Sequence, residues 1–289
     1  MGMNRRTLIP AKTGARRPTL AKKPPLGQSI NHQFKNSQRP FQWPPTPKKK
    51  IQTTSFPQVL QPPPYFPYKS AFLQACLSAS VLIFGTFTLK SGRQSPYFFN
   101  AGLFHEADLL HDISIAFAQT LISHISLNPT FSFDILFGPA YKGVPLATAV
   151  ALGLRELDPQ RFRKVQYSFN RKEIKDHGDG GAIVGAPLKG KKVVIVDDVI
   201  TAGTAMREAV EIIRGQGGIL VGVMVALDRM ERMRDDGGGS AIGEVKRQYG
   251  VPVLSIVDLN DLIGTLGGTV KKEDVRRVEE YKRRYGASD

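Results

Sequence analysis

From residue 68 onward, apolar positions follow two spacings that predict helices and strands in alternation. Helical spacing occurs in "KSAFLQACLSASVLIF" (69–84), "HEADLLHDISIAFAQTLISHI" (105–125) and "TAMREAVEIIRGQGG" (204–218). A further helix is expected from about residue 144 to 157. Short apolar runs predict buried strands in "FDILFGPA" (133–140), "KKVVIVDDV" (191–199), "ILVGVMVALDRM" (219–230) and "VPVLSIVDL" (251–259), the last of them between two helices. Alternation of such runs with helices is typical of an α/β fold whose mostly parallel sheet is flanked by helices on both faces.

Two segments depart from this alternation. "GTFTLKSGRQSPYFFNAG" (85–102) alternates polar and apolar residues around a Gly/Ser/Pro turn, which predicts a β-hairpin. "VQYSFNRKE" (165–173) predicts a strand that runs into a polar, glycine-rich loop, "KDHGDGGAIVG" (175–185).

The N-terminal segment has a different composition. Residues 1–67 hold thirteen of the twenty prolines, and residues 1–64 carry twelve Lys or Arg and no Asp or Glu. Such a segment buries too little apolar surface to offset its ordering entropy, which predicts a disordered basic tail (1–67) ahead of a folded domain (68–289). Residues 65–289 carry 28 basic and 25 acidic side chains, so the net charge of +15 belongs mainly to the tail.

Three other interpretations of the tail stay open. A mitochondrial targeting peptide is also basic and poor in acids, although the prolines oppose the amphipathic helix that it needs. A basic arm could bind nucleic acid or anionic lipid through charge alone, and "PKKK" (47–50) could act as a nuclear signal.

The remaining composition favours a cytoplasmic protein with no membrane span. The one cysteine, Cys76, fits a reducing compartment, and its surroundings predict a core-facing helix position. No apolar stretch approaches the length of a bilayer span, and the scattered histidines do not suggest a zinc site.

Polar clusters follow three of the predicted strands. They are Asp197-Asp198, residues 138–142, and Asp228-Arg229. Because ligands of open parallel sheets bind outside the carboxyl ends of the strands, these clusters predict one binding crevice.

The acid pair leads into "TAGT" (201–204), which opens the next helix. Small residues, unpaired helix N–H groups and two hydroxyls form a cradle for a phosphate. Neither a Walker A loop nor a G-x-G-x-x-G pattern is present. Beside a bound phosphate, Asp197 and Asp198 could accept hydrogen bonds from sugar hydroxyls or hold a hydrated Mg²⁺.

"VVIVDDVITAGT" (193–204) resembles the signature of type I phosphoribosyltransferases, which bind phosphoribosyl pyrophosphate. Three further motifs narrow this resemblance, over about residues 68–289, to the orotate phosphoribosyltransferase family: "LKSGRQSPYFFNAG" (89–102), "GPAYKG" (138–143) and "RKEIKDHGDGG" (171–181). The resemblance implies a type I phosphoribosyltransferase fold with a small hood subdomain. It also implies Mg²⁺-dependent transfer of phosphoribose to N1 of orotate, which gives orotidine 5′-monophosphate for pyrimidine synthesis.

The resemblance also implies the roles of individual residues. The sugar-phosphate site comprises Asp197, Asp198, Val199, Ile200, Thr201, Ala202, Gly203, Thr204 and Ala205. Tyr141 and Lys142 correspond to the pyrophosphate loop, and Lys90 reaches the substrate from the hairpin. Phe98, Phe99, Thr201 and Arg229 correspond to the orotate site. Since adjacent strand residues point to opposite faces, one of the two phenylalanines could belong to the core.

Arg171, Lys172, Lys175 and His177 correspond to a lid over the pyrophosphate, with glycines at 178, 180 and 181 that permit movement. Lys142, Lys172, Lys175 and Asp198 are the implied catalytic residues. The family further implies a homodimer that shares the lid between subunits. It implies no direct protein ligands for Mg²⁺ beyond Asp197 and Asp198 acting through water.

Two alternatives remain. A purine phosphoribosyltransferase would share the acid pair and phosphate turn but have another base pocket. A non-catalytic regulator could sense the sugar pyrophosphate and bind RNA, although nucleic acid is not the expected partner. The segment "MERMRDDGGGSAIGEVKRQYG" (230–250) resembles the fungal or enterobacterial form of the family and suggests no catalytic role.

Overall fold

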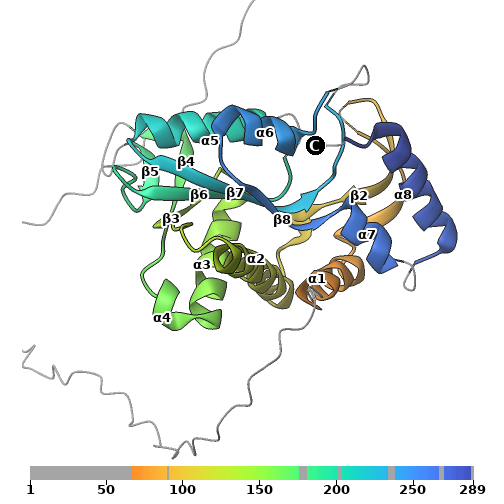
Figure 1. Cartoon of the computed structure of the whole chain (residues 1–289), viewed down its shortest axis with the longest axis horizontal. Coiled ribbons are helices and arrows are strands. Elements are labelled where there is room, and N and C mark those ends of the chain that lie inside the picture. The colour runs from red at the N-terminus through yellow and green to blue at the C-terminus, as the bar shows by residue number, and fades with distance from the viewer. Residues whose placement is uncertain are drawn as a thin grey trace, which may run out of the picture. The chain divides into compact units, whose positions relative to one another are not determined.

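Six strands form one sheet in the order β5-β4-β3-β6-β7-β8 (Figure 1). The strands are β3 (Ile135–Gly138), β4 (Gln166–Lys175), β5 (Gly181–Gly185), β6 (Lys192–Asp197), β7 (Ile219–Asp228) and β8 (Val253–Asp258). All neighbouring pairs are parallel except β4 and β5. The mostly parallel sheet that the apolar runs predicted is therefore confirmed.

The computed structural model describes residues 67–89, 91–175, 181–200, 203–233, 238–266 and 270–287. Residues 1–66 of the predicted tail, Lys90, His177, Thr201 and Ala202 lie outside the described residues, whereas Pro67 begins a helix and Lys175 is described by its main chain. The described elements belong to one unit, Gln61–Asp289. The predicted boundary between residues 67 and 68 stays a prediction.

Helices cover both faces of the sheet. α2 (Ala107–Leu127) and α3 (Gly143–Leu157) lie on one face, and α5 (Thr204–Gly215) and α6 (Ala241–Tyr249) lie on the other (Figure 1). Alternate strand residues serve the two cores, because successive strand side chains point to opposite faces: Val194 and Val196 pack toward α2 and α3, whereas Val193 and Ile195 pack toward α5 and α6. Among the described residues, no helix combines the length and apolar character that a bilayer span needs.

A second, two-stranded sheet forms the hood. β1 (Leu82–Thr88) and β2 (Gln94–Phe99) are antiparallel, as the alternating pattern predicted. The hood packs with α1 (Pro67–Ser78) and α8 (Lys272–Tyr285), and α7 (Leu259–Leu266) packs with these two helices. The remaining elements are the short α4 (Pro159–Phe162) and the 3-10 turn η1 (Ala101–Leu103). Cys76 is fully buried in α1, and burial raises the pKa of its thiol, as expected for a core position.

Two local predictions were wrong. The helix predicted for 69–84 ends at Ser78, because Ser80 adopts a left-handed backbone with φ of +57° and the chain turns into β1. Residues 181–185 were predicted as loop but form β5, which pairs with β4 through Ser168 opposite Gly185. Ile183 and Val184 favour a strand but are flanked by glycines and alanine, which do not, so pairing with β4 decides this conformation.

Candidate active site

The acid pair lies at the end of the central strand β6, with Asp197 as its last residue and Asp198 directly after it. The Asp198 N–H donates to Asp197 Oδ1 at 2.9 Å, and the Val199 N–H donates to Asp198 Oδ1 at 2.9 Å. The Asp198 carbonyl accepts from the Ala226 N–H of β7 at 2.8 Å. Ile200 is buried, so the predicted site residues Val199 and Ile200 anchor the turn in the two cores through their side chains.

Burial and the adjacent carboxylate of Asp198 raise the pKa of Asp197 to about 7, although Lys142 acts in the opposite direction. Two carboxylates in such proximity repel each other when both are ionised. The pair therefore favours a cation or a hydroxyl donor beside it.

The loop after β3 supplies such a cation. Lys142 Nζ lies 2.8 Å from Asp198 Oδ2, and the side chains are 59% and 13% exposed, respectively. Tyr141 is 75% exposed beside it. The structure thus brings together the predicted pyrophosphate loop and the predicted sugar-binding acids, which come from neighbouring strands.

Glycine is required where this loop returns toward the sheet. A Cβ at Gly138 would lie 2.1 Å from the Gly143 carbonyl oxygen, and a Cβ at Gly143 would lie 2.9 Å from the Val196 carbonyl oxygen. Both contacts are shorter than side chains tolerate, so the two glycines allow α3 to start against the end of β6. This close approach places Lys142 next to Asp198.

The predicted phosphate turn continues into α5. Gly203 has a φ of +71° and precedes the first helical residue, and within the described residues no side chain caps this helix start. Thr204 and Ala205 are exposed. The first N–H groups of α5 and its dipole are therefore available to an anion.

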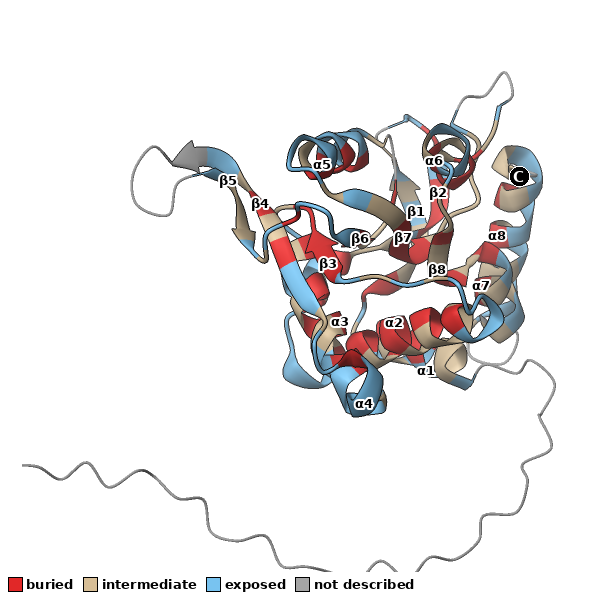
Figure 2. Ribbon diagram, turned by 60° about the vertical axis from the view of Figure 1, so that its left-hand side comes forward, coloured by how far each residue is buried: buried red, intermediate tan, exposed pale blue. Residues whose placement is uncertain are grey.

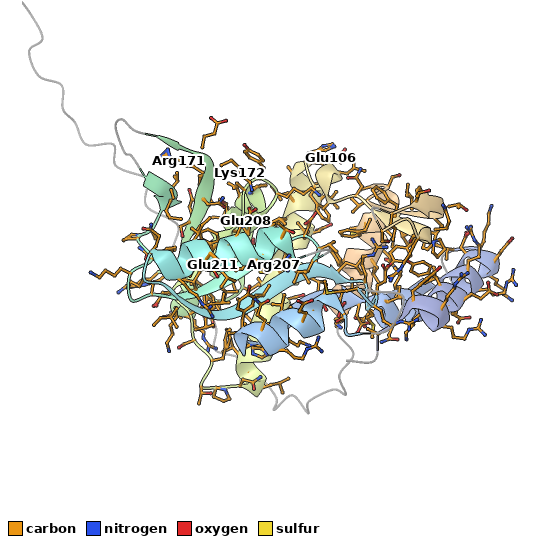
Figure 3. All side chains as sticks on the ribbon, turned by 90° about the horizontal axis from the view of Figure 1, so that it is seen from above. Glu106, Arg171, Lys172, Arg207, Glu208 and Glu211 are labelled. Carbon is orange, nitrogen blue, oxygen red and sulfur yellow. The ribbon has the colours of Figure 1, made fainter. Side chains whose placement is uncertain are left out.

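The predicted lid residues Arg171 and Lys172 lie on β4. Lys172 Nζ lies 3.3 Å from Glu208 Oε2 of α5, and both side chains are well exposed. Figure 3 shows Arg171 and Lys172 on the same side of the molecule as Arg207 and Glu208. The β4–β5 hairpin extends beyond the helices (Figure 2). It therefore presents basic side chains near the phosphate helix.

Asn170 is a site residue that the motifs did not reveal. Asn170 is buried, and its side-chain Oδ1 accepts a hydrogen bond from the Ala140 N–H at 2.9 Å. The Ala140–Tyr141 peptide bond that follows is cis. Asn170 therefore connects the lid strand to the pyrophosphate loop. The sequence offered one signal for it: Asn170 is a polar residue two positions after Ser168 in the predicted strand, so both side chains point to the same face.

The predicted base-site residues are divided between two faces of the hood. Phe98 is 38% exposed and lines a hollow of about 620 Å³ with Phe87, Asn100 and Leu103. Phe99 lies on the opposite face and packs on Phe104 with ring centroids 5.9 Å apart. The exposed ring is thus that of Phe98.

Arg229 follows β7 and lies on the other face of the hood. Its guanidinium lies 5.3 Å from the centre of the Tyr97 ring, and its Nε donates to Glu231 Oε1 at 2.9 Å. Tyr97 and Phe98 are adjacent in β2 and point to opposite faces. The structure therefore does not bring the Phe98 side chain and Arg229 together.

Comparison with known proteins identifies the family. Residues 107–239 match the model of the phosphoribosyl transferase domain. The chain is 55% identical over 230 residues to orotate phosphoribosyltransferase from Neurospora crassa, covering 77% of this chain and 98% of that protein. It is 51% identical over 221 residues to the Cronobacter sakazakii enzyme of the same name, covering 76% of this chain and 99% of that protein.

This chain belongs to the orotate phosphoribosyltransferase family. The crystal structure of Francisella tularensis orotate phosphoribosyltransferase agrees, with a TM-score of 0.64, 35% identity, and coverage of 75% of this chain and 100% of that one. The type I phosphoribosyltransferase fold is confirmed. The purine-specific alternative finds no support in these relatives, which are named for orotate.

The orotate phosphoribosyltransferase family implies Mg²⁺, and the donor set fits that ion. Asp197 and Asp198 supply the oxygen ligands that Mg²⁺ prefers, and their mutual repulsion favours a cation. Across the part of the chain that the structure describes, no three His, Cys, Asp or Glu side chains gather into a metal cage. The ion would therefore be held largely by the substrate, with the acid pair beside it.

Proposed function

We propose that this chain transfers the phosphoribosyl group from 5-phospho-α-D-ribose 1-diphosphate to N1 of orotate, giving orotidine 5′-monophosphate and pyrophosphate. The observation that carries this proposal is the contact between Lys142 and Asp198, which joins the pyrophosphate and sugar motifs in one place. The family membership supplies the base.

The sugar phosphate would bind where β6 meets α5. Asp197 and Asp198 would accept hydrogen bonds from the ribose hydroxyls. The 5-phosphate would accept hydrogen bonds from the N–H groups at the start of α5, from Gly203 to Ala205. The family resemblance assigns Thr201 and Ala202 to the same phosphate.

The reaction breaks the bond between the anomeric carbon and pyrophosphate oxygen and forms the bond from that carbon to N1 of orotate. Negative charge develops on the leaving pyrophosphate, so cations placed beside it lower the barrier. Lys142 is one such cation, and Arg171, Lys172 and Lys175 of the lid are further ones, with His177 as another lid contact to the pyrophosphate. Lys90 and Tyr141 would contact the same substrate. No covalent enzyme intermediate is needed.

Mg²⁺, when bound with the substrate, neutralises charge on the pyrophosphate oxygens. Asp197 and Asp198 would hold it through water, which leaves their other oxygens for the ribose. Replacing both with asparagine should weaken binding of the sugar pyrophosphate in calorimetry, and unchanged affinity would refute this assignment.

Orotate would lie under the hood. Arg229 carries the fork of N–H donors that suits a carboxylate, and Phe98 or Phe99 supplies a flat apolar contact for the ring. Phe98 is favoured as the orotate contact because its ring is exposed. Phe99 is favoured because it lies on the same face of β2 as Tyr97, beside which Arg229 lies. The variants Phe98→Ala and Phe99→Ala separate these options through the KM for orotate.

We also propose a homodimer with shared lids, which the projecting β4–β5 hairpin supports (Figure 2). Mixing an inactive lid variant, Lys175→Ala, with an inactive acid variant, Asp198→Asn, tests it. Subunit exchange would restore about a quarter of wild-type activity if each lid serves the partner's site. No restoration after verified exchange would place each lid over its own site.

The decisive assay follows the ultraviolet absorbance of orotate with phosphoribosyl pyrophosphate, with and without Mg²⁺. Mg²⁺-dependent loss of orotate is expected. No loss, with binding of the sugar pyrophosphate intact, would overturn the assigned reaction and favour the regulatory alternative, which filter binding of RNA would then test.

A further inference from the structure

Arg229 is held by a residue of the 230–250 segment, to which the sequence assigned no role. Glu231 Oε1 accepts from Arg229 Nε at 2.9 Å and lies 2.6 Å from Nη2. The two side chains are only 18% and 14% exposed. Glu231 therefore occupies the Nε–Nη2 edge of the planar guanidinium, and the Nη1–Nη2 edge faces away from it.

The ion pair with Glu231 uses only one edge of the guanidinium. Within the described part of the chain, Arg229 Nη2 is buried and has no aligned hydrogen-bond acceptor. Buried donors are nearly always satisfied in folded proteins, so the second edge favours a further acceptor. A carboxylate on the Nη1–Nη2 edge would satisfy it with two parallel hydrogen bonds.

The surroundings hold this ion pair from two sides. The Tyr97 ring of the hood lies beside the Arg229 guanidinium, and the Tyr281 ring of α8 meets Tyr97 edge-on at 6.4 Å. Burial and the nearby Glu231 carboxylate raise the pKa of Tyr281. Since an unrestrained arginine samples many rotamers, this packing pre-orders the guanidinium.

The backbone between the two charges is fixed by the end of the chain. Met230 has a φ of +50°, a conformation that non-glycine residues rarely adopt and that persists where the surroundings over-determine it. Its N–H donates to Asp228 Oδ1 at 2.8 Å, and its carbonyl accepts from the Ala287 N–H at 2.8 Å. The Arg232 N–H donates to the Tyr285 carbonyl at 2.9 Å. These bonds turn Glu231 back toward Arg229.

We propose that Glu231 is a positioning residue for base recognition, which holds the Arg229 guanidinium so that its second edge receives the carboxylate of orotate. The proposal rests on the proposed function. The segment after β7 and the end of α8 would then orient the Arg229 side chain toward the pyrimidine. Glu231 itself does not touch the substrate.

Two nucleotides isolate this role. Orotidine 5′-monophosphate and uridine 5′-monophosphate share ribose, phosphate and pyrimidine ring but differ in the carboxylate. Their dissociation constants are measured by calorimetry on the full-length wild type and on Glu231→Ala, Glu231→Gln and Glu231→Met. Glutamine retains an acceptor for Arg229, whereas methionine fills a similar volume without one and serves if the alanine variant does not fold.

The ratio of the two dissociation constants gives the result. In Glu231→Ala or Glu231→Met we expect a preference for orotidine 5′-monophosphate at least tenfold smaller than in wild type, with uridine 5′-monophosphate binding unchanged. Glu231→Gln should restore most of the preference. An unchanged ratio in folded Ala or Met variants, or an equal loss of affinity for both nucleotides, would overturn the proposal. A wild type that fails to convert orotate would overturn the proposed function instead.

Discussion

Lys142 Nζ lies 2.8 Å from Asp198 Oδ2, although 56 residues separate them in the chain. The lysine is the N-cap of α3 and the aspartate directly follows β6, and glycines 138 and 143 allow their close approach. In the free protein this cation partly neutralises two adjacent acids. When the sugar pyrophosphate binds, we expect the Lys142 ammonium group to turn to the phosphate oxygens. The ribose hydroxyls would then donate hydrogen bonds to the Asp198 carboxylate.

Lys142→Ala should depress turnover far more than stability. Because Lys142 is more than half exposed, its ion pair contributes about 1 kcal/mol or less to folding. Loss of a cation beside the leaving group should lower kcat/KM by roughly 100-fold or more. Steady-state kinetics and thermal melting check this, with Lys164→Ala as the exposed lysine control. Near-wild-type turnover would remove Lys142 from the catalytic machinery.

Asp197 should make stability fall as pH rises. Its pKa in the folded protein, about 7, lies above the ordinary value of 3.8, so the folded state binds this proton more tightly than the unfolded state. The stability contributed by the protonated form is present at low pH and is lost as pH rises from about 4 to about 7.

The variant Asp197→Asn should therefore gain stability relative to wild type between pH 5 and pH 8, by an amount on the order of 2 kcal/mol. Denaturant unfolding without substrate or Mg²⁺ at both pH values measures it. Glu279→Gln, which alters an exposed carboxylate of α8, is the control. A wild-type-like pH dependence in Asp197→Asn would exclude Asp197 as the titrating group.

The lid cations should matter for turnover and little for folding. Lys172→Ala removes a well-exposed ion pair with Glu208, so the free energy of unfolding should change by less than about 1 kcal/mol while kcat falls at least tenfold. Glu208→Ala breaks the same pair without removing a lid cation, and it should retain turnover. Lys175→Ala should behave like Lys172→Ala. Equal kinetic losses in the Lys172 and Glu208 variants would instead point to the ion pair itself.

Asn170→Ala should disturb the pyrophosphate loop from a distance. It leaves the Ala140 N–H without its acceptor, which costs about 1–3 kcal/mol when the group is buried. We expect a higher KM for phosphoribosyl pyrophosphate with little change in the KM for orotate. Asn170→Asp keeps the acceptor oxygen and should recover much of the loss. A rise in both KM values alike would indicate general misfolding of the sheet edge.

Deletion of residues 1–66 should leave catalysis intact, because every described site residue lies in the domain that follows. Activity, melting temperature and gel filtration of the shortened chain measure this. Fluorescent fusions with and without the segment report on the compartment, for which the cytoplasm is the expectation. Loss of folded enzyme would show that the segment is structural.

The sequence by itself determined the elements whose signal is local. The runs before Gly138, Asp198 and Arg229 predicted the three strands, and the acid pair followed by a small turn predicted a phosphate-binding helix start. These features depend on residues a few positions apart, where periodicity and turn chemistry dominate.

Tertiary structure alone decided the contacts that connect these motifs. β5 exists because β4 offers it a hydrogen-bonding edge, and Ser80 ends a helix that apolar spacing would have continued. The link from Asn170 to Ala140 depends on strand order. The bonds that join Tyr285 and Ala287 to Arg232 and Met230, which orient Glu231 toward Arg229 two residues before it, depend on the return of α8 to the hood. No local pattern encodes them, because each contact joins groups whose distance is set by packing.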